Sequence, residues 1–143
     1  MASTKWGDAT GQMFAVSIRY PRKAGETFNF RHWAEVHMPL GIATFDRVNG
    51  FTPERVMVQH ETCGMDGEAA SADSYITVWL MFNTRARMEG FLRVHRNSVK
   101  SAQLDRDFGN YTPLPPSITL GQVTVFDDMN AVLARGRPLL EPA

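Results

Sequence analysis

The chain has 143 residues, 43% of them hydrophobic, and its 15 basic and 15 acidic side chains give a formal net charge of zero. This length and composition indicate one domain with a hydrophobic core. No run reaches the roughly 18 apolar residues of a transmembrane helix, and the balanced charge disfavours nucleic acid and anionic membranes as partners.

The N-terminal region is polar, and we expect residues 1–12 to form a flexible arm rather than a secretory signal. The single cysteine, Cys63, cannot form an internal disulfide, which favours a cytoplasmic location. The first predicted element is a strand over residues 13–20, where apolar side chains alternate with small or polar ones.

A helix follows, with Thr27 as the expected N-cap and an end near Asp46. Pro39 removes one helical hydrogen bond, so we expect the helix to bend or loosen there. The apolar face, at helical spacing, consists of Phe30, Trp33, Ala34, His37, Leu40 and Thr44. The pattern therefore places a titratable imidazole on the face turned toward the core, beside a loosened turn.

The rest of the chain continues to alternate between strand and helix patterns. Apolar residues occupy nearly every position of the third strand, so we expect it to be covered on both faces. The elements are a strand at 51–59 that Pro53 weakens, a polar hairpin loop at 61–74, a strand at 75–82, a helix at 85–104, a strand at 117–126 and a C-terminal tail at 127–143.

The resulting order is strand, helix, strand, strand, helix, strand. This order predicts an α+β, ferredoxin-like βαββαβ fold, in which two helices cover one face of a four-stranded antiparallel sheet. The second face of the sheet is also apolar in the pattern, and a soluble monomer would have to hide it. We therefore expect a homodimer that closes two sheets into an α+β barrel.

Three blocks of the sequence carry a family resemblance: Tyr20-Pro21, F-N-F-R-H-W-A-E-V-H-M-P-L at 28–40, and D-F-G-N-Y-T-P-L-P-P at 107–116. On these residues the chain resembles an EthD-type protein of the dimeric α+β barrel superfamily, over residues 13–126. His32-Trp33 stand where that family has an aromatic pair. The resemblance implies a shape shared with polyketide cyclases, cofactor-free monooxygenases, lactone isomerases, dehydratases and haem-handling enzymes, and it does not fix a reaction.

His37 matches the histidine of the family's H-x-P-L motif and has two readings. It is either a core histidine bonded to the backbone or a general acid–base, because imidazole exchanges protons near neutral pH. His95 lies on the facing stripe of the second helix and could approach it across a cleft. The Tyr20 hydroxyl could donate to a substrate carbonyl. His37, Tyr20 and His95 are the candidate catalytic residues.

Further residues are expected to converge between sheet and helices as a substrate-binding wall, although packing in the core explains most of them equally well. They are Trp33, Tyr75, Trp79, Phe91, Asn110 and Tyr111. Asp107 and Asn110 are interpreted as turn residues that bond nearby backbone. Neither a metal-ligand spacing nor a glycine-rich dinucleotide turn is present, so we expect no metal and no cofactor.

The sequence thus favours a small cofactor-independent enzyme of secondary metabolism, a lyase or isomerase resembling polyketide cyclases. Its substrate would be a hydrophobic aromatic or polyketide-like carbonyl compound that undergoes dehydration, cyclisation or isomerisation. A cofactor-free monooxygenase of phenolic substrates would use the same pocket. A non-catalytic protein that binds or hands on a hydrophobic metabolite and a haem-handling variant remain as alternatives.

Overall fold

The computed structural model describes residues 6–22, 28–69 and 74–142. Its sheet has the strand order β2-β3-β1-β4, and every neighbouring pair is antiparallel. The strands are β1 (Gly11–Arg22), β2 (Arg55–His60), β3 (Ser74–Phe82) and β4 (Ser117–Val125). This topology confirms the ferredoxin-like α+β fold, whereas dimerisation stays a prediction.

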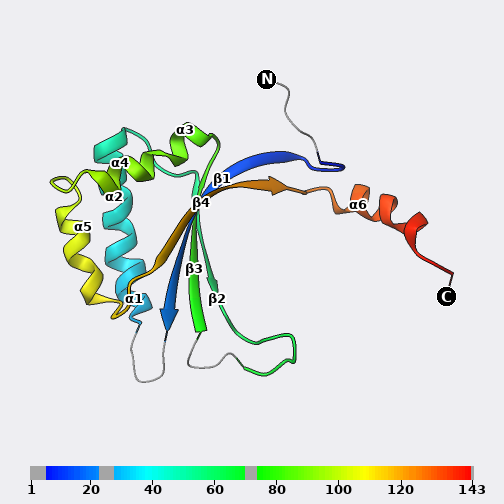
Figure 1. Ribbon diagram of the computed structural model, residues 1–143, viewed down its shortest axis with the longest axis horizontal. Helices are drawn as coiled ribbons and strands as arrows, with labels where there is room; N and C mark the ends of the chain where they lie inside the picture. The colour runs from blue at the N-terminus through cyan, green and yellow to red at the C-terminus, as the bar shows by residue number, and fades with distance from the viewer. Residues whose placement is uncertain (1–5, 23–27, 70–73, 143) are drawn as a thin grey trace.

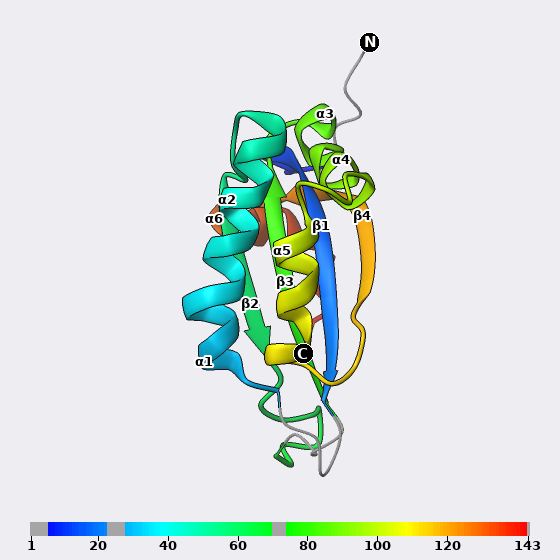
Figure 2. The same cartoon turned by 90° about the vertical axis from the view of Figure 1, so that its left-hand side faces the viewer.

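Helices of the two crossover connections pack on one face of the sheet (Figures 1 and 2). They are α1 (Phe30–His32), the π-helix η1 (Trp33–His37), α2 (Met38–Asn49), α3 (Arg85–Met88), α4 (Gly90–Arg96), α5 (Ala102–Asp107) and the 3₁₀-helix η2 (Phe108–Asn110). No helix in the described ranges combines the length and hydrophobicity that crossing a lipid bilayer requires.

The first helical segment begins at an Asx cap and contains a wide turn. The Asn29 side chain accepts from the His32 N–H at 3.0 Å, whereas the expected cap, Thr27, lies outside the described residues. The loosening expected at Pro39 takes the form of the π-helix directly before it, in which the Met38 N–H donates to the Trp33 carbonyl. Gly50, in the left-handed region at φ 79°, ends α2.

The prediction of one continuous helix over residues 85–104 is wrong, because the segment forms three shorter helices. The break after α4 has a visible cause at Asn97. Its backbone leaves the helical region at φ −98° and ψ 82°, and its side chain accepts from the Lys100 N–H at 3.0 Å. Asparagine competes with the helix in this way because its side chain offers the backbone a local partner.

The boundaries at the chain ends also differ from the sequence pattern. β1 includes Gly11 and Gln12 from the expected arm, and β2 begins only at Arg55, beyond Pro53. The expected C-terminal tail contains α6 (Met129–Gly136) and a 3₁₀-helix (Arg137–Leu139). Figure 1 shows α6 at the far end of the extended β1–β4 ribbon, away from the helices on the sheet.

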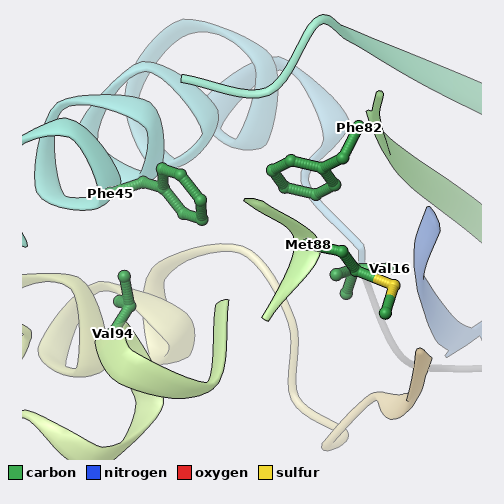
Figure 3. Close-up of a cluster of buried hydrophobic side chains, with 5 residues drawn as sticks. All are labelled: Val16, Phe45, Phe82, Met88 and Val94. Atoms are coloured by element: carbon green, nitrogen blue, oxygen red, sulfur yellow. The ribbon is translucent and has the colours of Figure 1, made fainter. Parts of the chain in front are cut away.

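Two clusters of buried side chains fill the layer between sheet and helices. The first, shown in Figure 3, is wholly apolar and joins Val16, Phe45, Phe82, Met88 and Val94. The second lies toward the start of the first helix and joins Tyr20, Trp33, Ile76, Val78 and Tyr111. The second cluster contains two phenol hydroxyls, which need partners once they are removed from water.

Candidate active site

A cavity of about 260 Å³ lies between the sheet and the helices. Its wall is mainly aliphatic and aromatic, as expected for a small-molecule site. Ile18 from β1, Val78 and Leu80 from β3 and Phe45 from α2 supply much of the apolar surface. Five of the predicted site residues line this cavity, namely Tyr20, Trp33, His37, Phe91 and His95.

His37 is a buried polar residue of this wall, and a carboxylate holds its ring. The His37 residue is 6% exposed, and its Nδ1 lies 2.9 Å from Oδ2 of Asp107. An ionised carboxylate only accepts hydrogen bonds, so Nδ1 carries the proton and Nε2 presents a lone pair. This is the orientation in which a carboxylate prepares a histidine to act as a base.

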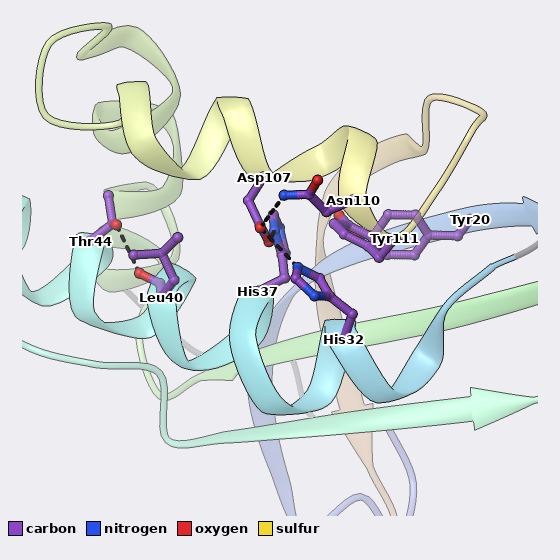
Figure 4. A network of polar contacts seen from close by, with 8 residues as sticks. All are labelled: Tyr20, His32, His37, Leu40, Thr44, Asp107, Asn110 and Tyr111. Carbon is purple, nitrogen blue, oxygen red and sulfur yellow. Dashed lines mark hydrogen bonds and ion pairs between the residues drawn. The ribbon is translucent and has the colours of Figure 1, made fainter.

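The same carboxylate holds a second histidine and an amide (Figure 4). Asp107 Oδ1 lies 2.9 Å from Nε2 of His32, and the Asn110 side chain donates to Oδ1 at 3.0 Å. Asp107 is 8% exposed, and these donors satisfy a charge that burial would otherwise make costly. We call His32, His37, Asp107 and Asn110 the carboxylate cluster.

The π-helix explains how one carboxylate reaches two histidines of the same helical segment. His32 and His37 are five positions apart. In an α-helix, such positions point about 140° away from each other. A π-turn closes between residues i and i+5, so it brings these positions to the same side. The wide turn over Trp33–His37 therefore directs both rings toward Asp107 (Figure 4).

The electrostatics favour a neutral imidazole beside an ionised carboxylate. Burial lowers the pKa of His37, and the hydrogen bond and charge of Asp107 offset this only in part. For Asp107, burial raises the pKa, but hydrogen bonds from Asn110, His32 and His37 together outweigh burial and leave the pKa lowered. At neutral pH, His37 is therefore an uncharged base with its partner ionised.

Two buried tyrosines form a pair next to His37. The hydroxyl oxygens of Tyr20 and Tyr111 are 3.0 Å apart, and both residues are 2% exposed. The Tyr111 ring packs on His37, with ring centroids 4.4 Å apart. Burial raises the pKa of Tyr20 and of Tyr111, so both hydroxyls stay protonated. When Tyr111 donates to Tyr20, the Tyr20 proton remains available to a group in the cavity.

Tyr75 and Trp79 do not converge on this site, and that part of the prediction is wrong. Both lie on the opposite face of the sheet, because side chains alternate along β3 and its neighbours Val78 and Leu80 line the cavity. Tyr75 is 36% exposed there, and the Arg19 guanidinium stacks 3.7 Å from its ring centroid. Because β3 is apolar at almost every position, its sequence does not indicate which side chains face the helices and which face the open side of the sheet.

The other predicted residues occupy distinct positions around the cavity. His95, near the end of α4, is exposed and lines the cavity. Asn110 and Tyr111 are not among the residues that line it. Asn110 donates to Asp107, and the Tyr111 ring packs on His37.

The sequence interpretation missed the roles of Asp107 and His32. The local pattern at Asp107 indicates turn chemistry, and only its position in the block at 107–116 points to a further role. His32 gave no signal beyond replacing one of an aromatic pair. In residues 6–22, 28–69 and 74–142, no group of three or more His, Cys, Asp or Glu side chains is placed to hold a metal ion.

Comparisons with family models and with curated proteins found no match. Among solved structures, an EthD-like protein from Ralstonia eutropha JMP134 is similar, with a TM-score of 0.62 and 18% identity over 83% of this chain and 98% of that chain. An ethyl tert-butyl ether D (EthD) family protein from Bacillus halodurans C-125 gives a TM-score of 0.47 and 13% identity over 77% of this chain and 96% of that one. The first likeness confirms the resemblance at the level of fold: the chain has the architecture of EthD-like proteins.

Proposed function

We propose that the protein is a cofactor-independent enzyme that transfers a proton within a hydrophobic carbonyl compound. One observation carries the proposal: the His37 ring lines an apolar cavity while Asp107 holds its Nδ1 at 2.9 Å. The carboxylate fixes the ring with its proton on Nδ1 and leaves Nε2 unprotonated, the state that a base requires. The apolar wall favours an aromatic or polyketide-like substrate.

The reaction begins when His37 Nε2 removes a proton from a carbon next to the substrate carbonyl. The electron pair moves into the carbonyl, and the enolate oxygen accepts a hydrogen bond from the Tyr20 hydroxyl. Asp107 stabilises the imidazolium that forms, since it already holds Nδ1. Return of the proton to a β-hydroxyl group expels water and completes a dehydration, and return to another carbon completes an isomerisation.

The decisive experiment replaces His37 with asparagine, whose amide can keep the hydrogen bond to Asp107 but has no basic nitrogen. The panel of substrates consists of β-hydroxy ketones with aromatic rings. We expect kcat to fall by about 10²–10⁴-fold with ligand affinity retained, the range typical of a lost general base. His60→Gln is the control, because it also removes a histidine but His60 is exposed on β2 and does not line the cavity.

The outcomes separate the alternatives. Full turnover by a folded His37→Asn protein would contradict the proposed base. Tight binding without turnover by the wild type would instead indicate a non-catalytic carrier of a hydrophobic metabolite. Oxygen consumption with a phenolic substrate would indicate a monooxygenase that uses the same cavity.

We further propose that the protein works as a homodimer in which the open face of the sheet is covered by a second copy. Support comes from the exposed apolar side chains on that face, where Met57 is 41% and Tyr75 36% exposed. Trp79 lies on the same face of β3 as Tyr75 and is directly opposite Met57 on β2. Covering such a face is the usual reason for sheet-to-sheet association.

A further inference from the structure

The carboxylate cluster contains a histidine that the proposed reaction does not use. His32 is not among the residues that line the cavity, and 25% of its side chain is exposed against 8% for His37. Both rings nevertheless bond the same carboxylate at 2.9 Å, one to each oxygen. A single negative charge thus serves two groups that can each become cationic.

Sharing one carboxylate couples the two rings. A carboxylate stabilises the first imidazolium beside it by opposite charge, but it does less for a second one, because the first cation has already neutralised it. The more exposed ring loses less hydration when it becomes charged. A positive charge at the His32 position therefore makes a proton on His37 less favourable, and it acts through the carboxylate that the two rings share.

His95 and Asp105 line the same cavity as His37, whereas the hydrogen bonds to the Asp107 carboxylate come from the two rings and Asn110. Arg31 and Glu35, on the same helical segment, pair with each other at 3.1 Å in solvent. From the segment after α5, Tyr111 faces both rings as a neutral phenol, with centroids 6.5 Å from His32 and 4.4 Å from His37. Tyr20 reaches the group through Tyr111.

We infer that His32 is a positioning residue that controls, through Asp107, how strongly the His37 imidazole holds a proton. In the uncharged form, His32 donates one hydrogen bond and leaves the full carboxylate charge to His37. In the charged form, it takes most of that charge and weakens His37 as a base. Its effect on catalysis rests on the proposed function, whereas its effect on the titration of His37 does not.

The test is a histidine NMR titration of the whole protein, which follows the His37 ring in wild type and in two variants. His32→Gln can keep a donor at the Nε2 position without a charge, so we expect the His37 midpoint to rise by about one pH unit. His32→Arg carries a permanent charge, so we expect the midpoint to fall. His60→Gln should leave it unchanged, because His60 is exposed on β2 and is not among the residues that line the cavity.

Opposite shifts in the two His32 variants would support the inference, and unchanged midpoints in both would overturn it. If neither variant folds, the wild type decides: coupled rings show two-step titration curves, and independent one-step curves for His32 and His37 would contradict the inference. Activity separates it from the proposed function. If the His37 midpoint shifts but turnover does not depend on His37, the proposed enzymatic role is wrong. The coupling between His32 and His37 through Asp107 then still holds.

Discussion

The hydroxyl oxygens of Tyr20 and Tyr111 lie 3.0 Å apart in a buried layer, one residue on β1 and the other just after η2. This contact joins the sheet to the segment that carries Asp107. Each hydroxyl is the other's hydrogen-bond partner, so removing one leaves the other short of a partner away from water.

The first prediction concerns this pair. Tyr20→Phe and Tyr111→Phe should each lower the free energy of unfolding by about 1–3 kcal/mol, the cost of an unsatisfied buried hydroxyl. The double variant should lose less than the sum, because neither tyrosine hydroxyl is then left without the other. Urea denaturation of the four proteins measures this, and strictly additive losses would show that the hydroxyls do not interact.

The second prediction follows from the lowered pKa of His37. Because the folded pKa lies below the ordinary 6.5, the unfolded chain binds more protons between these two values. The free energy of unfolding should therefore be highest above pH 6.5 and fall as the pH drops through 6.5 toward the folded pKa. Urea unfolding in that window should show a smaller decline for His37→Asn than for wild type. Equal slopes would contradict the direction of the shift.

The third prediction uses the opposite partner. The lowered pKa of Asp107 gives stability that is present above the ordinary value of 3.8 and disappears as the pH falls below it, through the folded pKa. Asp107→Asn should cost about 1–3 kcal/mol at neutral pH, with the gap to wild type closing in acid. Asp105→Asn is the control, since Asp105 is exposed on the same helix. A gap that stays constant down to low pH would count against an ionised Asp107.

The fourth prediction concerns the close approach of α2 and α4 at Gly90. A Cβ there would lie 3.0 Å from Cζ of Phe45 and 3.1 Å from Cγ of Asn49. Asn49 cannot easily move, because its side chain donates to the Gly90 carbonyl at 3.0 Å and accepts from Arg93 at 2.7 Å.

Gly90→Ala should therefore destabilise the protein by about 1–3 kcal/mol, the usual cost of overpacking. Gly136→Ala, in a helix with no heavy atom within 4 Å of its new Cβ, should be neutral or slightly stabilising. Thermal unfolding of both variants checks the contrast, and equal melting temperatures would show that the helices separate without cost.

The fifth prediction tests the proposed dimer. A charge at Trp79, on the open face of the sheet opposite Met57, cannot be buried between two sheets without a partner. Light scattering should give the mass of a monomer for Trp79→Glu. Val99→Glu is the control and should leave the mass unchanged, because Val99 is exposed in the segment between α4 and α5. A monomeric wild type would contradict the proposal directly.

The sequence could predict the fold and the inward direction of His37, because both follow from local periodicity. His37 recurs with Trp33 and Thr44 on one helical face, and all three residues are buried. The strand order also follows from element order through a well-known motif.

The carboxylate cluster could not be predicted in this way, because its partners are distant in the chain. Asp107 reaches His37 across 70 positions, and nothing local distinguishes such a carboxylate from a turn residue. Similarly, the uniformly apolar pattern around Trp79 gave no clue to its face, and the hydrogen bond at Asn97 that divides the second helix is invisible to apolar spacing.

The wide turn over Trp33–His37 makes this region sensitive to insertion and deletion. Loss of one residue from it would restore a regular α-helix and place the two histidines four positions apart, which changes the register of everything before Pro39. Alignment of related chains should therefore treat a one-residue gap here as a change of site architecture. Four positions apart in an α-helix the two imidazoles would still share a face, so chain length at this point sets how the segment before Pro39 is aligned with the rest of the site.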